Sequence, residues 1–206
     1  MTNLQYLLAM IYVGDNSLSH EDERKARALI QQPKSTSMNV PMQPELGSPI
    51  IFWLLDFVSS SYPQKKLRLI QMLLETMPID IKNPEGRTPL LYVLQRVHSP
   101  GGTLGFTEDL VCMFLEAGAS VHARSEDGMT ALHAVCQLSM TGVAHDFTSR
   151  DCIDTERRTY TDIEGRVPKM MQMLLQHGAD VTATDKHGHT PRHYAVLNGW
   201  EKELSG

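Results

Sequence analysis

One sequence pattern occurs three times in this chain of 206 residues, and it constrains the fold more than any other feature. The copies are EGRTPLLYVL from Glu85, EDGMTALHAVC from Glu126 and DKHGHTPRHYAV from Asp185. Each has a glycine, one variable residue and a threonine, followed by an apolar run. Self-similarity of this kind is typical of a fold in which small units of the same type stack on one another.

A second pattern precedes two of these copies. The segments FLEAGASVHARSEDG and LLQHGADVTATDKHG each contain two glycines that are ten residues apart. In each segment an apolar run ends at the first glycine, Gly118 or Gly178. Glycine tolerates a positive φ, so both positions are predicted to end a helix.

The repeated threonines mark helix starts. A threonine hydroxyl can accept a hydrogen bond from a free backbone N–H in the first turn, and proline fits the first helical position because it has no N–H to leave unpaired. The threonines are Thr88, Thr130 and Thr190, and the prolines are Pro89 and Pro191. A second helix is predicted from apolar residues at helical spacing, as at Val167, Met170, Met171, Leu174 and Leu175.

These motifs, in this order, resemble the ankyrin repeat family over about residues 83–198. The resemblance implies an all-α solenoid of about five helix-pair units, with turns that project from one edge and long insertions between the two helices of several repeats. The predicted helices cover 2–13, 20–32, 49–59, 65–77, 89–97, 107–117, 131–138, 167–177 and 191–198.

The whole chain, residues 1–206, is expected to form one such domain. Residues 1–47 would be an atypical helix pair with an irregular connector at 33–47, and residues 48–82 a degenerate repeat. Two fuller repeats would follow at 83–124 and 125–184, and a partial one at 185–206. The short last unit indicates either a piece of a longer protein or a very short final helix, and Arg192 fits a last repeat with one side in water.

The copies are farther apart than the ankyrin period of about 33 residues. Thr88 and Thr130 are 42 residues apart, Thr130 and Thr190 are 60 apart, and Pro49 and Pro89 are 40 apart. Because the spacing after each second helix is intact, the extra residues are placed between the two helices of each repeat. The longest insertion covers about 139–166. We expect it to be dispensable for folding, and the insertions to lie along the edge opposite the turns.

Composition argues against several classes of protein. The net charge is −5, so there is no basic excess for nucleic acid. The cysteines are few and odd in number, which favours a reducing, intracellular compartment, either cytoplasmic or nuclear. The apolar residues 1–13 lack a basic start and a cleavage site, and they are too few to span a membrane. The three cysteines are Cys112, Cys136 and Cys152.

Metal and nucleophile sites were weighed and set aside. Zinc prefers imidazole and carboxylate ligands, and the C-terminal segment holds several of these at Asp185, His187, His189 and His193, with His177 nearby. However, His133 and His193 occupy the repeat's own histidine position, which the resemblance assigns to a structural hydrogen bond back to the turn. No oxyanion motif flanks a cysteine, and Cys136 is expected to be buried and inert. We therefore expect no enzyme, no cofactor and no metal.

The resemblance implies a protein-binding module that uses the turn tips and the exposed side of each first helix, and possibly the inter-helix insertions. The alternative is a regulatory or targeting segment of a larger multidomain enzyme. The candidate partner-binding residues are Lys82, Glu85, Arg87, Gln95, Arg96, Arg124, Glu126, Asp127, Met129, Gln137, Leu138, Lys186, His187, His189 and Asn198.

Charge suggests the kind of partner. Five of these residues are Lys or Arg and three are Asp or Glu, so the set has a net charge of +2 on a chain of −5. Arg87 and Arg124 are expected on adjacent turns, where their planar forks would bind an acidic or phosphorylated segment of another protein. The alternative is that they only balance the nearby carboxylates. Neither nucleic acid nor a membrane is expected as a partner.

Overall fold

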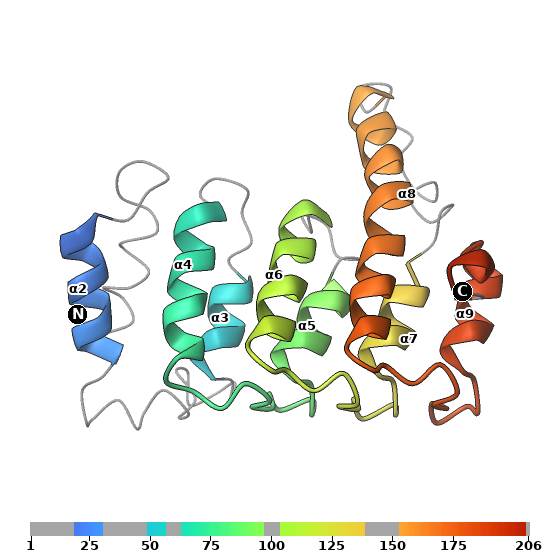
Figure 1. Ribbon diagram of the computed structural model, residues 1–206, viewed down its shortest axis with the longest axis horizontal. Coiled ribbons are helices and arrows are strands. Elements are labelled where there is room, and N and C mark those ends of the chain that lie inside the picture. The colour runs from blue at the N-terminus through green and yellow to red at the C-terminus, as the bar shows by residue number, and fades with distance from the viewer. Residues whose placement is uncertain (1–18, 31–48, 57–62, 97–103, 139–152, 205–206) are drawn as a thin grey trace. The chain divides into compact units, whose positions relative to one another are not determined.

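The computed structural model describes residues 19–30, 49–56, 63–96, 104–138 and 153–204. Within these ranges the chain is all-helical and has no strand, with eight α-helices and one 3-10 helix (Figure 1). It divides into two compact units, Met1–Pro89 and Leu90–Gly206. No helix in the described ranges combines the length and apolar character needed to cross a membrane.

The N-terminal unit contains three described helices, α2 (His20–Ile30), α3 (Ile50–Asp56) and α4 (Pro63–Leu74). Helix α4 packs against both α2 and α3. Its buried side chains follow helical spacing, and α3 is buried along most of its length. Two ion pairs attach α2 to the middle of α4 and to the residue that follows it, Arg68–Glu23 at 2.7 Å and Arg27–Glu75 at 2.5 Å. The apolar core residues are Ile50, Ile51, Phe52, Leu54 and Leu55 of α3 and Leu69, Ile70, Met72 and Leu73 of α4.

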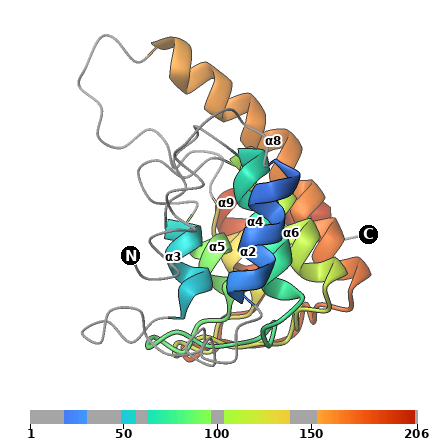
Figure 2. The ribbon, with the colours of Figure 1, turned by 90° about the vertical axis from the view of Figure 1, so that its left-hand side faces the viewer.

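In the C-terminal unit, short and long helices alternate along the chain. The short ones are α5 (Pro89–Arg96), α7 (Ala131–Cys136) and α9 (Pro191–Asn198), and the long ones are α6 (Leu104–Glu116) and α8 (Ile153–Gln176). A 3-10 helix, η2 (Glu201–Leu204), follows α9. Helix α6 packs on α8, and α7 packs on α8 and α9. Figure 2 shows α6 and α8 on one side of this unit and α5 and α9 on the other.

Both long helices end in the same way. Gly118 and Gly178 have φ values of 89° and 83°, as the sequence predicts. The N–H of each glycine donates to the carbonyl three residues earlier, and the next N–H donates to the carbonyl five residues before it. These two bonds satisfy carbonyls that the end of a helix would otherwise leave unpaired. The chain is thereby directed into the turns at the lower side of Figure 1.

The structure corrects one helix boundary substantially. The helix predicted over 167–177 begins at Ile153 and runs to Gln176, so it takes up residues 153–166 of the predicted insertion. Pro168, which fits a helix start, lies inside the helix instead. Figure 1 shows the N-terminal half of α8 extending beyond α6 and α7, away from the turns. This part of the insertion therefore lies on the expected side and is helical. Its dispensability for folding stays a prediction.

The other predicted helices that fall within the described ranges agree with the structure to within three residues at each end. Helix α9 matches its predicted bounds at both ends. The 3-10 helix after it was not predicted. The predicted helix at 2–13 and the connector at 33–47 lie outside the described residues, as do residues 139–152 of the insertion.

One carboxylate ties the two long helices together. Glu108 of α6 is only 11% exposed and pairs with Arg166 at 2.7 Å and with Lys169, both on α8. Burial alone would raise the pKa of Glu108, but the hydrogen bonds and charges of Lys169 and Arg166 outweigh it and lower the pKa. The ionised form is therefore favoured in the folded chain.

We predict that Glu108→Gln lowers the free energy of unfolding by about 1.5–3 kcal/mol, the usual contribution of hydrogen bonds to a charged group. The neighbouring Asp109 is exposed, so Asp109→Asn is the matched control and should change little. Because the folded pKa of Glu108 is lowered, the wild-type advantage should be complete above pH 4.5 and disappear as the pH falls through the folded value. Urea unfolding at several pH values measures this. Equal stability of the two variants at pH 7 would contradict it.

Candidate functional site

Three turns of the chain share one hydrogen-bond pattern. The first residue of each turn donates its backbone N–H to the carbonyl four residues later, at 2.9–3.0 Å. Its side-chain oxygen accepts the N–H of that same later residue, at 2.8–3.3 Å. These first residues are Asn83, Ser125 and Asp185, and their partners are Arg87, Met129 and His189. Sequence reasoning missed this role, although a short oxygen-bearing side chain three residues before each turn glycine was a readable signal.

Asp185 is the most heavily bonded of the three. Its side chain is 1% exposed, and its Oδ1 accepts the N–H groups of His187 at 2.8 Å and His189 at 2.9 Å. Its Oδ2 accepts the Tyr194 hydroxyl at 2.6 Å. Burial would raise the pKa of Asp185, but these hydrogen bonds outweigh it and lower the pKa to about 2. This carboxylate, weighed from the sequence as a metal ligand, therefore anchors the turn.

Two successive turns of the C-terminal unit contact one another through backbone. The N–H of Lys186 donates to the carbonyl of Asp127 at 2.9 Å. Gly128 has a φ of 75°, and a Cβ placed on it would lie 3.2 Å from the Lys186 nitrogen. Only glycine fits this approach without a shift of one turn. The tips at 126–127 and 186–187 are therefore held side by side.

Arg124 also bridges the two turns. Its Nη1 donates to the carbonyls of Gly128 at 3.2 Å and Thr184 at 2.6 Å. In the described part of the chain no carboxylate forms an ion pair with it. Because both bonds use one nitrogen, the Nε and Nη2 edge of the guanidinium remains available as a planar fork. Arg124 as a whole is exposed.

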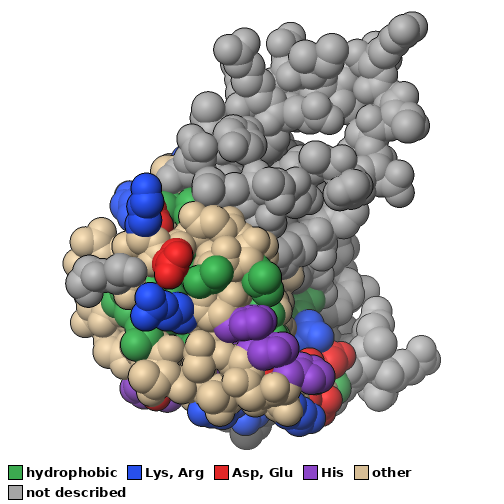
Figure 3. All heavy atoms as spheres, turned by 90° about the vertical axis from the view of Figure 1, so that its right-hand side faces the viewer, with side chains coloured by type: hydrophobic (Ala, Val, Ile, Leu, Met, Phe, Trp, Pro, Cys, Tyr) green, Lys and Arg blue, Asp and Glu red, His purple; other side chains and the backbone are tan. Residues whose placement is uncertain are grey.

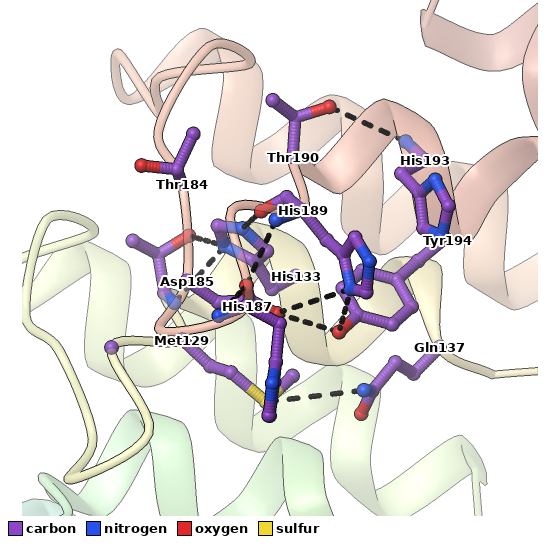
Figure 4. A network of polar contacts seen from close by, with 12 residues as sticks. Met129, His133, Gln137, Thr184, Asp185, His187, His189, Thr190, His193 and Tyr194 are labelled. Carbon is purple, nitrogen blue, oxygen red and sulfur yellow. Dashed lines mark hydrogen bonds and ion pairs between the residues drawn. The ribbon is translucent and has the colours of Figure 1, made fainter.

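His133 joins α7 to the next turn, as Figure 4 shows. Its Nδ1 accepts the Thr130 N–H at 3.2 Å and lies 2.8 Å from the Thr130 hydroxyl. Its Nε2 is 3.1 Å from the carbonyl oxygen of His189. An Nδ1 that accepts a backbone N–H carries no proton, so Nε2 holds the proton and donates it to that carbonyl. This is the structural hydrogen bond that the resemblance assigned to the position.

Three histidines, two exposed and one half-buried, form a row at the end of the unit, visible in Figure 3. The rings of His189 and His193 stack with centroids 4.1 Å apart and planes within 5°. The His187 ring is 6.0 Å from that of His189. In parallel stacked rings the nitrogen lone pairs do not converge on one point, as ligands of one metal ion must. Among the described residues, no group of three or more potential ligands could hold a metal.

The cysteines that the structure describes are poor nucleophiles. Cys136 is fully buried, and burial raises the pKa of its thiol to about 12. Burial also raises the pKa of Cys112, and the nearby Glu116 carboxylate adds to this effect. Thiolate is the reactive form, so both groups are held in the unreactive one at neutral pH. Cys152 lies outside the described residues.

The predicted partner-binding residues fall into four groups. Lys82, Glu85, Arg124, Glu126, Asp127, Lys186 and His187 are exposed. Arg87, Gln95, Gln137, His189 and Asn198 are half-buried. The exposure of Arg96 lies outside the description. Met129 and Leu138 are buried, at 8% and 4% exposure, which corrects their prediction as contact residues because they offer a partner almost no surface.

Two of the half-buried candidates also hydrogen-bond within the C-terminal unit. Asn198 donates to the carbonyl of Cys136 at 3.0 Å, and Gln137 lies 3.9 Å from the Met129 sulfur. Lys82, Glu85 and Arg87 belong to the N-terminal unit and Arg124 to the other. The expectation that Arg87 and Arg124 act together stays a prediction.

No protein-family model matches this chain, and no curated protein matches it significantly. The resemblance to ankyrin repeats therefore rests on the sequence pattern of the chain itself.

We predict that Gly128→Ala destabilises the chain more than Gly188→Ala. Both glycines have positive φ, 75° and 78°, so both variants carry the same backbone strain of about 1–2 kcal/mol. Only at Gly128 would the new Cβ also meet the next turn, whereas Gly188 has nothing within 4 Å. Overpacking of this kind adds about 1–3 kcal/mol. Equal losses in urea unfolding would show that the turns do not approach as described.

Proposed function

We propose that this chain is an ankyrin-repeat protein that binds another protein through the turn tips of its C-terminal unit. The observation that carries the proposal is the backbone bond between Lys186 and Asp127. It fixes two exposed, charged tips next to each other, so little conformational entropy is lost when a partner binds there. A turn, a short helix and a long helix recur in this order along the chain, which supports the interpretation as a repeat protein.

The partner carries a carboxylate or phosphate that Arg124 binds. Net charge does not support this choice, because the exposed tips of the C-terminal unit hold two basic residues, Arg124 and Lys186, and two acidic ones, Glu126 and Asp127. The support comes from the geometry of Arg124. Two backbone carbonyls hold its side chain in place, and the fork that remains matches the paired oxygens of a carboxylate or phosphate.

A pair of charge reversals tests the proposal. Lys186 and Lys202 are both exposed and lie in the same unit, but only Lys186 is on a turn tip. We expect Lys186→Glu to reduce the capture of a specific set of proteins from cell lysate at least tenfold, and Lys202→Glu to leave it unchanged. Both variants should keep the wild-type melting midpoint, and capture by the wild type should weaken with added salt.

Quantitative mass spectrometry of the captured proteins gives the comparison. The proposal would be wrong if the two variants captured the same proteins in the same amounts as the wild type. It would also be wrong if both lost them equally, because charge alone would then explain the effect.

A further inference from the structure

His133 is a buried ionisable group at the joint between α7 and the terminal segment, residues 185–204 (Figure 4). Its side chain is 0% exposed. In the neutral ring, Nδ1 accepts the N–H of Thr130 and Nε2–H donates to the carbonyl of His189. The ring therefore caps the start of α7 and binds the next turn. Both hydrogen bonds need the tautomer that carries its proton on Nε2.

A proton on Nδ1 would break this arrangement. The bond from the backbone N–H of Thr130 would then be lost, because two donors would face each other there, and the new N–H could donate only to the Thr130 hydroxyl oxygen, 2.8 Å away. A charge would also be buried without a compensating ion pair, which is costly in a protein interior. The bond to His189 would survive, because Nε2 is a donor in either form.

Charged and polar groups face the ring from the turn and from α9. From the turn, the Asp185 carboxylate and the carbonyls of His189 and Ala183 favour the charged ring, whereas Arg124 opposes it. From α9, the Tyr194 ring contributes an edge contact at 6.1 Å. Burial is the largest effect and lowers the pKa of His133 below its usual 6.5. Asp185 itself stays ionised in mild acid, because its pKa is about 2.

Several polar bonds hold the terminal segment to α7 and to the preceding turn. Besides the His133 bond, they include the Lys186 N–H to Asp127, the Asn198 amide to Cys136 and the Trp200 indole N–H to Leu138. Cys136, the acceptor for Asn198, is the last residue of α7, and Leu138, the acceptor for Trp200, follows two residues later. His133 caps the start of the same helix. A disturbance of α7 would therefore reach most of these bonds.

We propose that this joint is a proton-sensitive hinge, in which protonation of His133 releases the terminal segment reversibly in mild acid. The released segment includes Lys186 and His187, so acid would also weaken the binding of a partner at the turn tips. That consequence rests on the proposed function, whereas the hinge itself does not.

The direction of the effect follows from proton linkage. The open joint binds a proton at about pH 6.5, and the closed joint binds it only at lower pH. The closed state is therefore at full stability above pH 6.5. Below that, the ratio of closed to open molecules should fall by up to about tenfold per pH unit, until the closed state takes up the proton as well.

Hydrogen exchange of the full chain between pH 7.5 and 5.0 tests the hinge, with rates corrected for the intrinsic exchange at each pH. We expect the protection of backbone amides in 185–204, such as those of His189 and Trp200, to fall by up to about fivefold from pH 6.5 to 5.5, because the open joint is already half protonated at pH 6.5. Amides of α6, which contains no histidine, should lose much less. Equal protection of both segments at every pH, or an equal loss in both, would overturn the proposal.

Two variants identify the group responsible. His133→Gln removes the titration while keeping an amide donor for His189, and it should abolish the selective loss of protection in 185–204. His122→Gln replaces an exposed histidine in the same unit and should behave as the wild type. A selective loss that persists in His133→Gln would overturn the assignment.

If His133→Gln does not fold, NMR of the wild-type chain tests the hinge, because the nitrogen chemical shifts of the His133 ring report its tautomer and its titration. A ring that carries its proton on Nδ1 at pH 7.5, or one that titrates without any loss of protection in 185–204, would overturn the hinge. No partner is present in these measurements, so their result is independent of the proposed function.

Discussion

The hydrogen bond from the Lys186 N–H to the Asp127 carbonyl is the contact on which the C-terminal unit depends most. It joins two turns that are far apart in sequence and sets how closely the helices behind them can pack. Gly128 is required beside it, because any Cβ would meet the backbone of the next turn. Two side chains reinforce the same junction. Arg124, on the first turn, bonds to the carbonyl of Thr184, and His133, on α7, bonds to the carbonyl of His189.

This junction also separates structural residues from exposed ones. Asp185, His133 and Thr130 are buried, and their side chains hydrogen-bond to backbone groups and to other side chains inside the unit, so they define the turn without being offered to a partner. Glu126, Asp127, Lys186 and His187 stand on the same frame with exposed side chains. Exposed side chains on a hydrogen-bonded backbone frame suit a recognition surface, because little backbone conformational entropy is then lost when a partner binds. Arg124 belongs to both groups, since one of its nitrogens bonds to backbone carbonyls of both turns and the residue is exposed.

Much of the fold could be predicted from the sequence because the repeat gives the same local signals several times. Threonine before proline, apolar spacing and a terminal glycine located α9, α6 and the ends of both long helices. The start of α8 was missed because its first residues are polar, and a polar segment next to a proline resembles a loop until packing decides otherwise. The role of Asp185 was missed because acid and histidine together suggest a metal, whereas the carboxylate is consumed by backbone N–H groups. The fixed side chain of Arg124 depends on a carbonyl 60 residues away, a contact that no local pattern reveals.

The central claim is that the two turns meet through backbone, and NMR of the isotope-labelled full chain tests it most directly. The account predicts a scalar coupling across the hydrogen bond between the Lys186 nitrogen and the Asp127 carbonyl carbon. It also predicts strong nuclear Overhauser contacts from the Gly128 Hα protons to the Lys186 amide proton and the Asp185 Hα. Assigned spectra in which Gly128 shows contacts only within its own turn, with a freely exchanging Lys186 amide, would contradict the junction and the surface built on it.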